Sequence, residues 1–326
     1  MELTPDQRAL RDAVRGLLTR HRGDDGLWPR LAREVGVAGL AIPEDCGGAG
    51  AGPVEIHIVL EELGRGLTTT PMLGSAVLAT EALLAAGDDA ACRRLLPGLA
   101  AGTSTAALAW TGPDGRWDPA RVACRASAEA SVTGEAHYVL DGAGADALLV
   151  AADGPDGIAL FELDPAQPGV TRTPVITMDQ TRRLATVRLD GAAGRRLGSR
   201  LDLARVRDLA CIALSAEQAG AAGQALDLTV AYTKVREQFG RPIGGFQGLQ
   251  HRLADLHVLV SSARSLSYAA AEAAADREPG LDLRAAAART AATEALTRTA
   301  AEMIQMHGAI GITWEHDAHR LSLIHI

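Results

Sequence analysis

The segment 232–247 stands out in the sequence for the residue types that it brings together. It places arginines, a glycine-rich turn and a glutamine beside aromatic side chains, although aromatic residues make up only 3% of the chain. An arginine offers a fixed fork to a pyrophosphate, an aromatic ring offers a flat surface to a base, and glycines allow close approach of the backbone. These types indicate a nucleotide seat. On residue types alone, a helix C-terminus followed by an ordinary turn is the simpler interpretation.

The elements that must position this segment are mainly helices. Apolar residues recur at helical spacing in both outer parts of the chain, and Thr4 followed by Pro5 is a typical helix start. Long helices joined by short connections favour an antiparallel bundle in the last third. After the first helix, which starts at Pro5, the predicted helices cover 28–35, 53–62, 76–86, 203–235, 247–275 and 283–306.

The middle of the chain has a different pattern. Short apolar runs at 147–150, 158–161 and 185–189 alternate with Asp-Gly pairs, which tolerate the positive φ angles of hairpin turns. We therefore predict an α+β fold with three parts. These are an N-terminal α-helical domain over 1–103, a middle antiparallel β domain over 104–198, and a C-terminal antiparallel helix bundle over 199–326.

Composition excludes several classes of function. The chain has 326 residues, 47% of them apolar, which is enough for two or three domains with a real core. A formal net charge of −8 argues against binding to a nucleic-acid backbone or to anionic lipid. Four widely spaced cysteines, no recognisable signal peptide and no apolar run long enough for a membrane span predict a cytoplasmic protein with reduced thiols.

Four stretches together resemble the acyl-CoA dehydrogenase family. Residues 236–256 carry Arg-Glu-Gln-Phe-Gly-Arg-Pro-Ile-Gly and then His-Arg-Leu-Ala-Asp-Leu, and 305–316 carry Gln-Met-His-Gly-Ala-Ile-Gly-Ile-Thr-Trp-Glu-His. Near the front, 39–48 and 59–65 resemble the N-terminal domain of the family. The resemblance runs in the family's order over residues 1–320. It implies the same helix, sheet and bundle architecture, in a short bacterial form that can be one subunit of a heteromeric enzyme.

The resemblance implies FAD as the cofactor, with the isoalloxazine between the β domain and the bundle. Thr111 matches the position that bonds the flavin ring edge, Tyr138 matches the aromatic residue against the flavin, and Leu140 replaces a common threonine near flavin N5. The predicted flavin contacts of the β domain are Trp110, Thr111, Tyr138, Val139 and Leu140. A neighbouring subunit would hold the adenosine pyrophosphate, which implies an obligate dimer or tetramer. The positions that match this second set are Arg236, Phe239, Gln247, Gln305 and Gly308.

The catalytic base is the weakest part of the pattern. The family's reaction needs a carboxylate that takes the α-proton of an acyl thioester. One family position for this base aligns with Ala210, and the other lies beyond the end of this chain. Glu217 returns to the same helix face two turns after Ala210, so it is the predicted base, with a structural role as the alternative. Glu237 and Glu315 are weaker candidates, because each adjoins a flavin-anchoring stretch.

Two further features of the C-terminal region bear on function. His316 and His319 lie three residues apart, but no third ligand follows at a suitable spacing, so no metal site is predicted. Residues 321–326 do not resemble the family, and we expect a truncated or aberrant end there.

The leading hypothesis is an FAD-dependent acyl-CoA dehydrogenase. It would desaturate an acyl-CoA between the α and β carbons, by α-proton abstraction and β-hydride transfer to flavin N5. Its electrons would pass to an electron-transfer flavoprotein, in fatty acid or sterol catabolism. The alternatives are a non-catalytic subunit that completes the FAD site of a heteromeric enzyme, a flavin-dependent monooxygenase on the same fold, and a plain helical scaffold.

Overall fold

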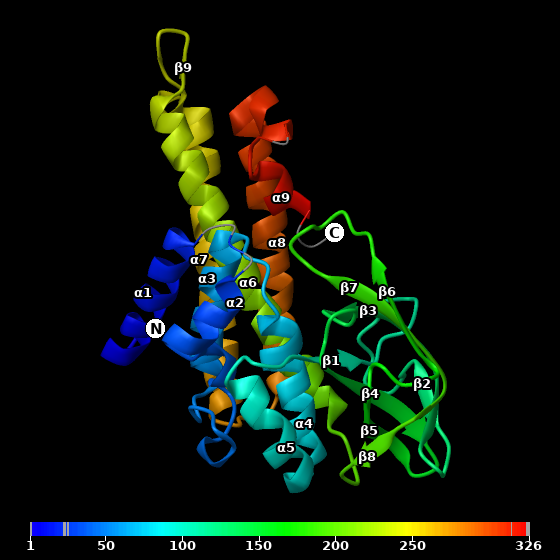
Figure 1. The fold of residues 1–326 in the computed structure, drawn as a ribbon. Helices are drawn as coiled ribbons and strands as arrows, with labels where there is room; N and C mark the ends of the chain where they lie inside the picture. The colour runs from blue at the N-terminus through cyan, green and yellow to red at the C-terminus, as the bar shows by residue number, and fades with distance from the viewer. Residues whose placement is uncertain (1, 22–23, 25, 314, 324–326) are drawn as a thin grey trace.

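The computed structural model describes residues 2–21, 24, 26–313 and 315–323. Helices at both ends of the chain pack together into one body, and the β domain lies beside it (Figure 1). The prediction of an α+β fold that ends in a helix bundle is confirmed. The boundaries of the three predicted domains stay a prediction.

The N-terminal helices begin where the sequence supplies caps. The Thr4 hydroxyl accepts a hydrogen bond from the Gln7 backbone N–H at 3.2 Å, and the Gln7 side chain accepts one from the Thr4 N–H at 3.0 Å. This capping box starts the first helix. The α-helices of this part are α1 (Pro5–Arg20), α2 (Leu27–Arg30), α3 (Pro53–Gly66), α4 (Thr80–Ala86) and α5 (Asp89–Ala100).

Some N-terminal boundaries differ from the prediction. The helix predicted over 28–35 is α2 followed by a wider π-helical turn, Leu31–Val35. The helix predicted over 76–86 begins earlier, with the π-helical segment Met72–Ala79, and continues as α4. The predicted set lacks α5, which Asp88 caps by accepting a hydrogen bond from the Ala91 N–H.

The β domain is one eight-stranded sheet in the order β6-β7-β3-β2-β4-β5-β8, with β1 paired to β4. Most pairs are antiparallel, as predicted, but β4 runs parallel to both β1 and β2. The Asp190-Gly191 pair is not at a hairpin turn; it lies inside β7, where the pairing with β3 changes register. The strands are β1 (Ala106–Ala109), β2 (Cys124–Ala126), β3 (Ser131–Leu140), β4 (Ala147–Gly154), β5 (Gly157–Leu163), β6 (Val170–Val175), β7 (Leu184–Ala193) and β8 (Arg195–Leu197).

Three long helices form the bundle: α6 (Leu203–Val235), α7 (Gln247–Ala275) and α8 (Leu281–His307). The predicted bounds of α6 and α7 are confirmed, and α8 is slightly longer than predicted. A two-stranded hairpin, β9 (Glu237–Gln238) and β10 (Arg241–Pro242), joins α6 to α7, and a short α9 (Ala318–Leu323) follows α8. The hairpin projects from one end of the bundle, away from the β domain (Figure 1).

Glycines bring α3 and α6 into backbone contact. A Cβ atom at Gly64 would lie 2.0 Å from the Glu217 carbonyl oxygen, and one at Gly220 would lie 1.9 Å from the Glu61 carbonyl oxygen. No larger residue fits either position unless the helices move apart. This contact fixes the N-terminal helices to the bundle. It also sets where Glu217 lies relative to α3.

Among the described residues, we find no helix that combines the length and the apolar character needed to cross a bilayer. The four cysteines are free thiols.

Candidate functional site

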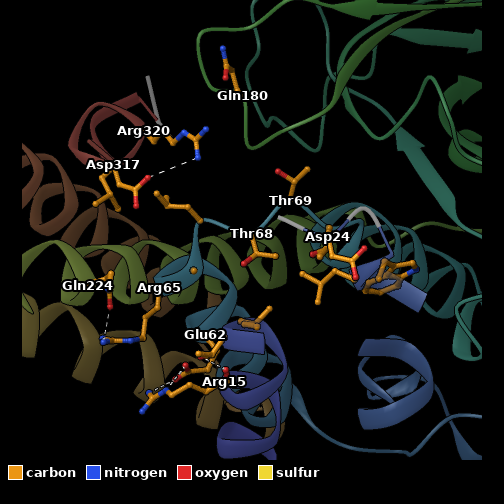
Figure 2. Close-up of a pocket in the computed structure, with 18 of the residues that line it drawn as sticks. Arg15, Asp24, Glu62, Arg65, Thr68, Thr69, Gln180, Gln224, Asp317 and Arg320 are labelled. Carbon is orange, nitrogen blue, oxygen red and sulfur yellow. Dashed lines mark hydrogen bonds and ion pairs between the residues drawn. The ribbon is translucent and has the colours of Figure 1, made fainter. Parts of the chain in front are cut away.

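A cavity of about 840 Å³ opens where the N-terminal helices, the β domain and the bundle meet (Figure 2). Its wall comes from α1, α3, the segment 66–71, Asp141, the segment that joins β6 to β7, α6 and α9. Its volume falls in the range of small-molecule sites.

Most charged side chains of the cavity wall have a partner within the chain. Arg15 donates two hydrogen bonds to the Glu62 carboxylate, at 2.8 and 2.6 Å. Arg65 donates to Gln224 at 2.9 Å and to Asp227, just outside the wall, at 2.8 Å. The Arg15–Glu62 ion pair and the Arg65–Gln224 hydrogen bond, seen along the lower wall in Figure 2, make that wall rigid and nearly neutral.

Two other stretches of the wall offer hydrogen-bonding groups that have no partner in the described part of the chain. The hydroxyls of Thr68 and Thr69 and the amide of Gln180 make no side-chain hydrogen bond to any residue in the described ranges. Gln180 lies across the cavity from the two threonines (Figure 2). A ligand or water can therefore bond to these groups without breaking a contact within the chain.

Glu217, the predicted base, is held in an ion pair. Arg182, from the segment between β6 and β7, donates a 2.5 Å hydrogen bond to the Glu217 carboxylate, and it also lies 3.7 Å from Asp179. Both side chains of the Arg182–Glu217 pair are largely buried. Burial disfavours the charged guanidinium, yet the Glu217 carboxylate outweighs it and raises the pKa of Arg182 above its ordinary value. Glu217 is not among the described residues that form the cavity wall.

Asp141 is the carboxyl group of the β domain that does line the cavity. It directly follows β3 in the left-handed conformation, with φ of 55°. No described residue makes a hydrogen bond or a close ion pair with its side chain. Burial raises its pKa to about 6, although the positive charges of Arg183 and Arg182 act to lower the pKa. The sequence did not point to Asp141, because an Asp-Gly pair is first of all a turn signal.

The predicted flavin contacts of the β domain gather at the ends of β1 and β3. Trp110 and Thr111 are buried directly after β1, and the Thr111 hydroxyl donates to the His137 carbonyl. Tyr138 also has a positive φ, and its ring is 48% exposed. Leu140 is partly buried, whereas the Val139 side chain packs in the sheet core, so only its backbone is available to a ligand.

The second predicted set lies at the projecting end of the bundle. Tyr232 stacks on His307 with the ring centroids 4.2 Å apart, which joins the end of α6 to the end of α8. The Phe239 ring is 92% exposed at the hairpin tip. The side chains of Arg236, Gln247 and Gln305 are exposed, and within the described ranges none makes a hydrogen bond or ion pair. Gly308 has φ of 65° and open space where a side chain would be.

The two predicted sets are therefore not brought together within one chain. Arg236 follows Glu217, which faces the β domain, by nineteen residues, a rise of about 28 Å along α6. The structure shows a mostly buried set in the β domain, with Tyr138 exposed, and an exposed set at the bundle tip.

The two histidines are bonded locally. The His316 ring accepts from the Ala318 N–H at 3.1 Å, and the His319 ring lies 2.5 Å from the His316 carbonyl oxygen. In the described parts of the chain, no three His, Cys, Asp or Glu side chains cluster as a metal site would require. Trp314 and residues 324–326, which enter the sequence predictions, lie outside the described residues.

Comparison with known proteins gives matches over the length of the chain. Residues 4–103 match the model of the acyl-CoA dehydrogenase N-terminal domain, and residues 199–324 match that of the C-terminal domain. Acyl-CoA dehydrogenase IpdE2 of Mycobacterium tuberculosis is 39% identical over 97% of this chain and 90% of its own length.

Solved structures agree in fold. The Tcur3481–Tcur3483 steroid ACAD variant has a TM-score of 0.88 and 32% identity, over 98% of this chain and 91% of that one. The ChsE4–ChsE5 complex from Mycobacterium tuberculosis has a TM-score of 0.90 and 30% identity, and the match covers 99% of this chain and 92% of that one.

Proposed function

Because the chain belongs to the acyl-CoA dehydrogenase family, whose members are oxidoreductases acting on CH–CH bonds, we propose that it desaturates an acyl-CoA with FAD as cofactor. A carboxylate would accept the α-proton, and the β-hydrogen would pass to the flavin as hydride. The cavity at the junction of the three parts is the proposed acyl site.

The observation that supports this proposal best is the character of the two residue sets. At the bundle tip, Arg236 offers a diphosphate a guanidinium that no described residue binds, Phe239 offers an exposed ring for an adenine, and Gly308 leaves room for close approach. In the β domain, Thr111 bonds to His137, the residue before Tyr138, so both predicted isoalloxazine contacts lie close together. Groups of these types fit FAD. The two sets lie at opposite ends of one chain's bundle, which supports a cofactor site shared by two subunits.

The chain's own residues would orient and enclose the reacting groups. The Thr111 hydroxyl has given its hydrogen to the His137 carbonyl, so its oxygen can only accept a bond from a ring N–H. The ring of Tyr138 would cover one side of the isoalloxazine, and Leu140 would exclude water without bonding. FAD, when bound, supplies the hydride acceptor. Glu217 stays a prediction for the proton acceptor; it would serve only after its ion pair with Arg182 opens.

The partners follow from the family and from its heteromeric relatives. We propose an acyl-CoA from fatty acid or sterol catabolism as substrate, since one structural neighbour is a steroid ACAD. An electron-transfer flavoprotein would reoxidise the flavin. A homo- or hetero-oligomer would complete the cofactor site, as the ChsE4–ChsE5 neighbour is itself a complex of two chains.

The test is flavin binding followed by reduction. Purified protein is mixed with FAD, and we expect the absorbance of bound flavin and a higher Tm. Anaerobic addition of ring-bearing or straight-chain acyl-CoA should then bleach the flavin. A protein that neither binds FAD nor gains stability from it, alone or with a co-expressed partner chain, would contradict the proposal.

A second candidate is a non-catalytic subunit that completes the FAD site of another chain. The ion pair that occupies Glu217 favours it, because a base should be free to take a proton. Co-expression with a second acyl-CoA dehydrogenase chain separates the two candidates. In the second case, bleaching of the complex would survive substitution of every carboxyl group that lines the cavity of this chain.

A further inference from the structure

Two carboxyl groups approach the junction of the β domain and the bundle, and their surroundings differ. Glu217 is engaged with Arg182 at 2.5 Å, whereas the Asp141 carboxyl lies in the cavity wall without a direct partner among the described residues. A general base needs a free lone pair directed at the substrate. Among the described residues no group occupies the Asp141 carboxylate, whereas Arg182 occupies the Glu217 carboxylate.

The backbone holds Asp141 in place. The residue has φ of 55°, a conformation that Asp and Asn tolerate better than other non-glycine residues. A Cβ atom at Gly74 would lie 2.8 Å from the Asp141 Oδ2 atom and 3.1 Å from the Leu140 Cβ atom. Glycine at position 74 therefore leaves the space that the carboxyl group occupies. Asp141 directly follows Leu140, the residue assigned to the flavin N5 region.

The charges around Asp141 come from one side. Arg182 and Arg183, in the segment that joins β6 to β7, attract its carboxylate from beyond ion-pair distance. The segment Met72–Ala79, which packs against it from the other side, carries no ionisable side chain. Burial against this neutral segment keeps the pKa near 6, a value suited to accepting a proton at neutral pH.

We propose that Asp141 is the catalytic base, the residue that takes the α-proton of the acyl group bound in the cavity. This rests on the proposed dehydrogenase function. The Cα–H bond breaks, and its proton forms a bond to an Asp141 carboxylate oxygen. The electron pair becomes the new Cα–Cβ double bond as the β-hydrogen leaves, with its own pair, for the oxidised flavin that the proposed function names. The acyl group loses two electrons, and the flavin gains them.

The experiment compares Asp141→Asn with wild-type protein loaded with FAD. Asparagine keeps the left-handed backbone and the size of the side chain but cannot accept the proton. We expect acyl-CoA binding to persist, while bleaching slows by about 10²- to 10⁴-fold. In D₂O, exchange of the α-hydrogen of the acyl-CoA, read by mass spectrometry, should slow by a similar factor. Asp141→Glu should restore part of both rates.

Asp153→Asn is the matched control. Asp153 also precedes a glycine, but it is exposed at the end of β4 and outside the cavity wall, so neither rate should change. Wild-type bleaching should also rise with pH through about 6, and this rise should vanish in Asp141→Asn.

Full bleaching and full α-hydrogen exchange in Asp141→Asn would overturn the assignment, and a selective loss in Glu217→Gln would transfer it to Glu217. If wild-type protein binds FAD but no acyl-CoA bleaches it or exchanges its α-hydrogen, the proposed function fails, and Asp141 fails as base with it.

Discussion

The junction of the three parts and the tip of the bundle differ in how their arginine side chains are paired. At the junction, Arg15, Arg65 and Arg182 each have a carboxylate or amide partner within the chain. At the tip, Arg236 has none among the described residues, and the Phe239 ring faces solvent. The arginine contacts of the junction are complete in one chain, whereas the exposed groups of the tip are free to bind another molecule. Substitutions at the junction should therefore change the stability of the chain, and those at the tip should change cofactor retention.

The largest effect is expected for Gly64→Ala. Its new Cβ atom would overlap the Glu217 carbonyl oxygen of α6, and backbone cannot yield as a flexible side chain does. We expect unfolding to become easier by about 3 kcal/mol or more, measured by urea denaturation. Gly223→Ala, also on α6, meets only the end of Arg65 and should be neutral or stabilising by up to about 1 kcal/mol. Equal effects of the two changes would refute the close contact of α3 and α6.

Arg182→Met should cost slightly less. It leaves the Glu217 carboxylate largely buried without its partner, a loss of about 3 kcal/mol in typical cases. The double change Arg182→Met with Glu217→Gln removes the stranded charge and should recover part of the loss. A single variant as stable as wild type would mean that the ion pair does not hold the β domain to the bundle.

The pH dependence of stability should report Asp141. Its pKa of about 6 in the folded state exceeds the ordinary value of 3.8, so the folded state binds more protons than the unfolded state between these pH values. Stability should therefore fall as pH rises from about 4 to 6 and stay lower above it. The difference between wild type and Asp141→Asn should change by about 2 kcal/mol across this window in thermal melts. A flat difference would place the carboxyl group in water.

Arg236→Ala should have the smallest free-energy effect, and that effect should be confined to the cofactor. Loss of a charge-assisted phosphate contact should weaken FAD retention by about 1.5 kcal/mol, roughly tenfold. The Tm of the FAD-free protein should not change, because no described residue depends on the guanidinium. Lys234→Ala removes a cation two residues earlier on α6 and serves as the control. A fall in the Tm of the FAD-free protein would show that the tip belongs to the stability of a single chain.

Much of the fold could be predicted from local pattern. The bounds of α6 and α7 follow from apolar spacing and from the glycines and proline of the connecting turn. The chain turns at 154–157 as the Asp-Gly pairs indicate. By contrast, α5 contains Pro97 and carries little periodicity beyond alanine and leucine, so pattern alone passes over it.

The candidate site was only partly predictable. The resemblance to the family predicts which residues of the β domain and of the bundle tip contact FAD. These contacts remain proposals. The partner of Glu217 could not be predicted, because Arg182 is 35 residues away and on another domain. The position of the Asp141 side chain could not be predicted either. It depends on the space that Gly74, which has no side chain, leaves for the carboxyl group. Contacts between domains leave no periodic signal along the chain.

The contact of α3 with α6 has a consequence for synthesis on the ribosome. Gly64 and Gly220 pack across the same helix pair, yet 156 residues separate them along the chain. Synthesis proceeds at about 5–20 residues per second. The apolar face of α3 therefore stays exposed for roughly 8 to 30 s before α6, which packs against it, has been made. During that interval, the newly made N-terminal helices are natural clients for a chaperone, and truncated chains that end before α6 should aggregate.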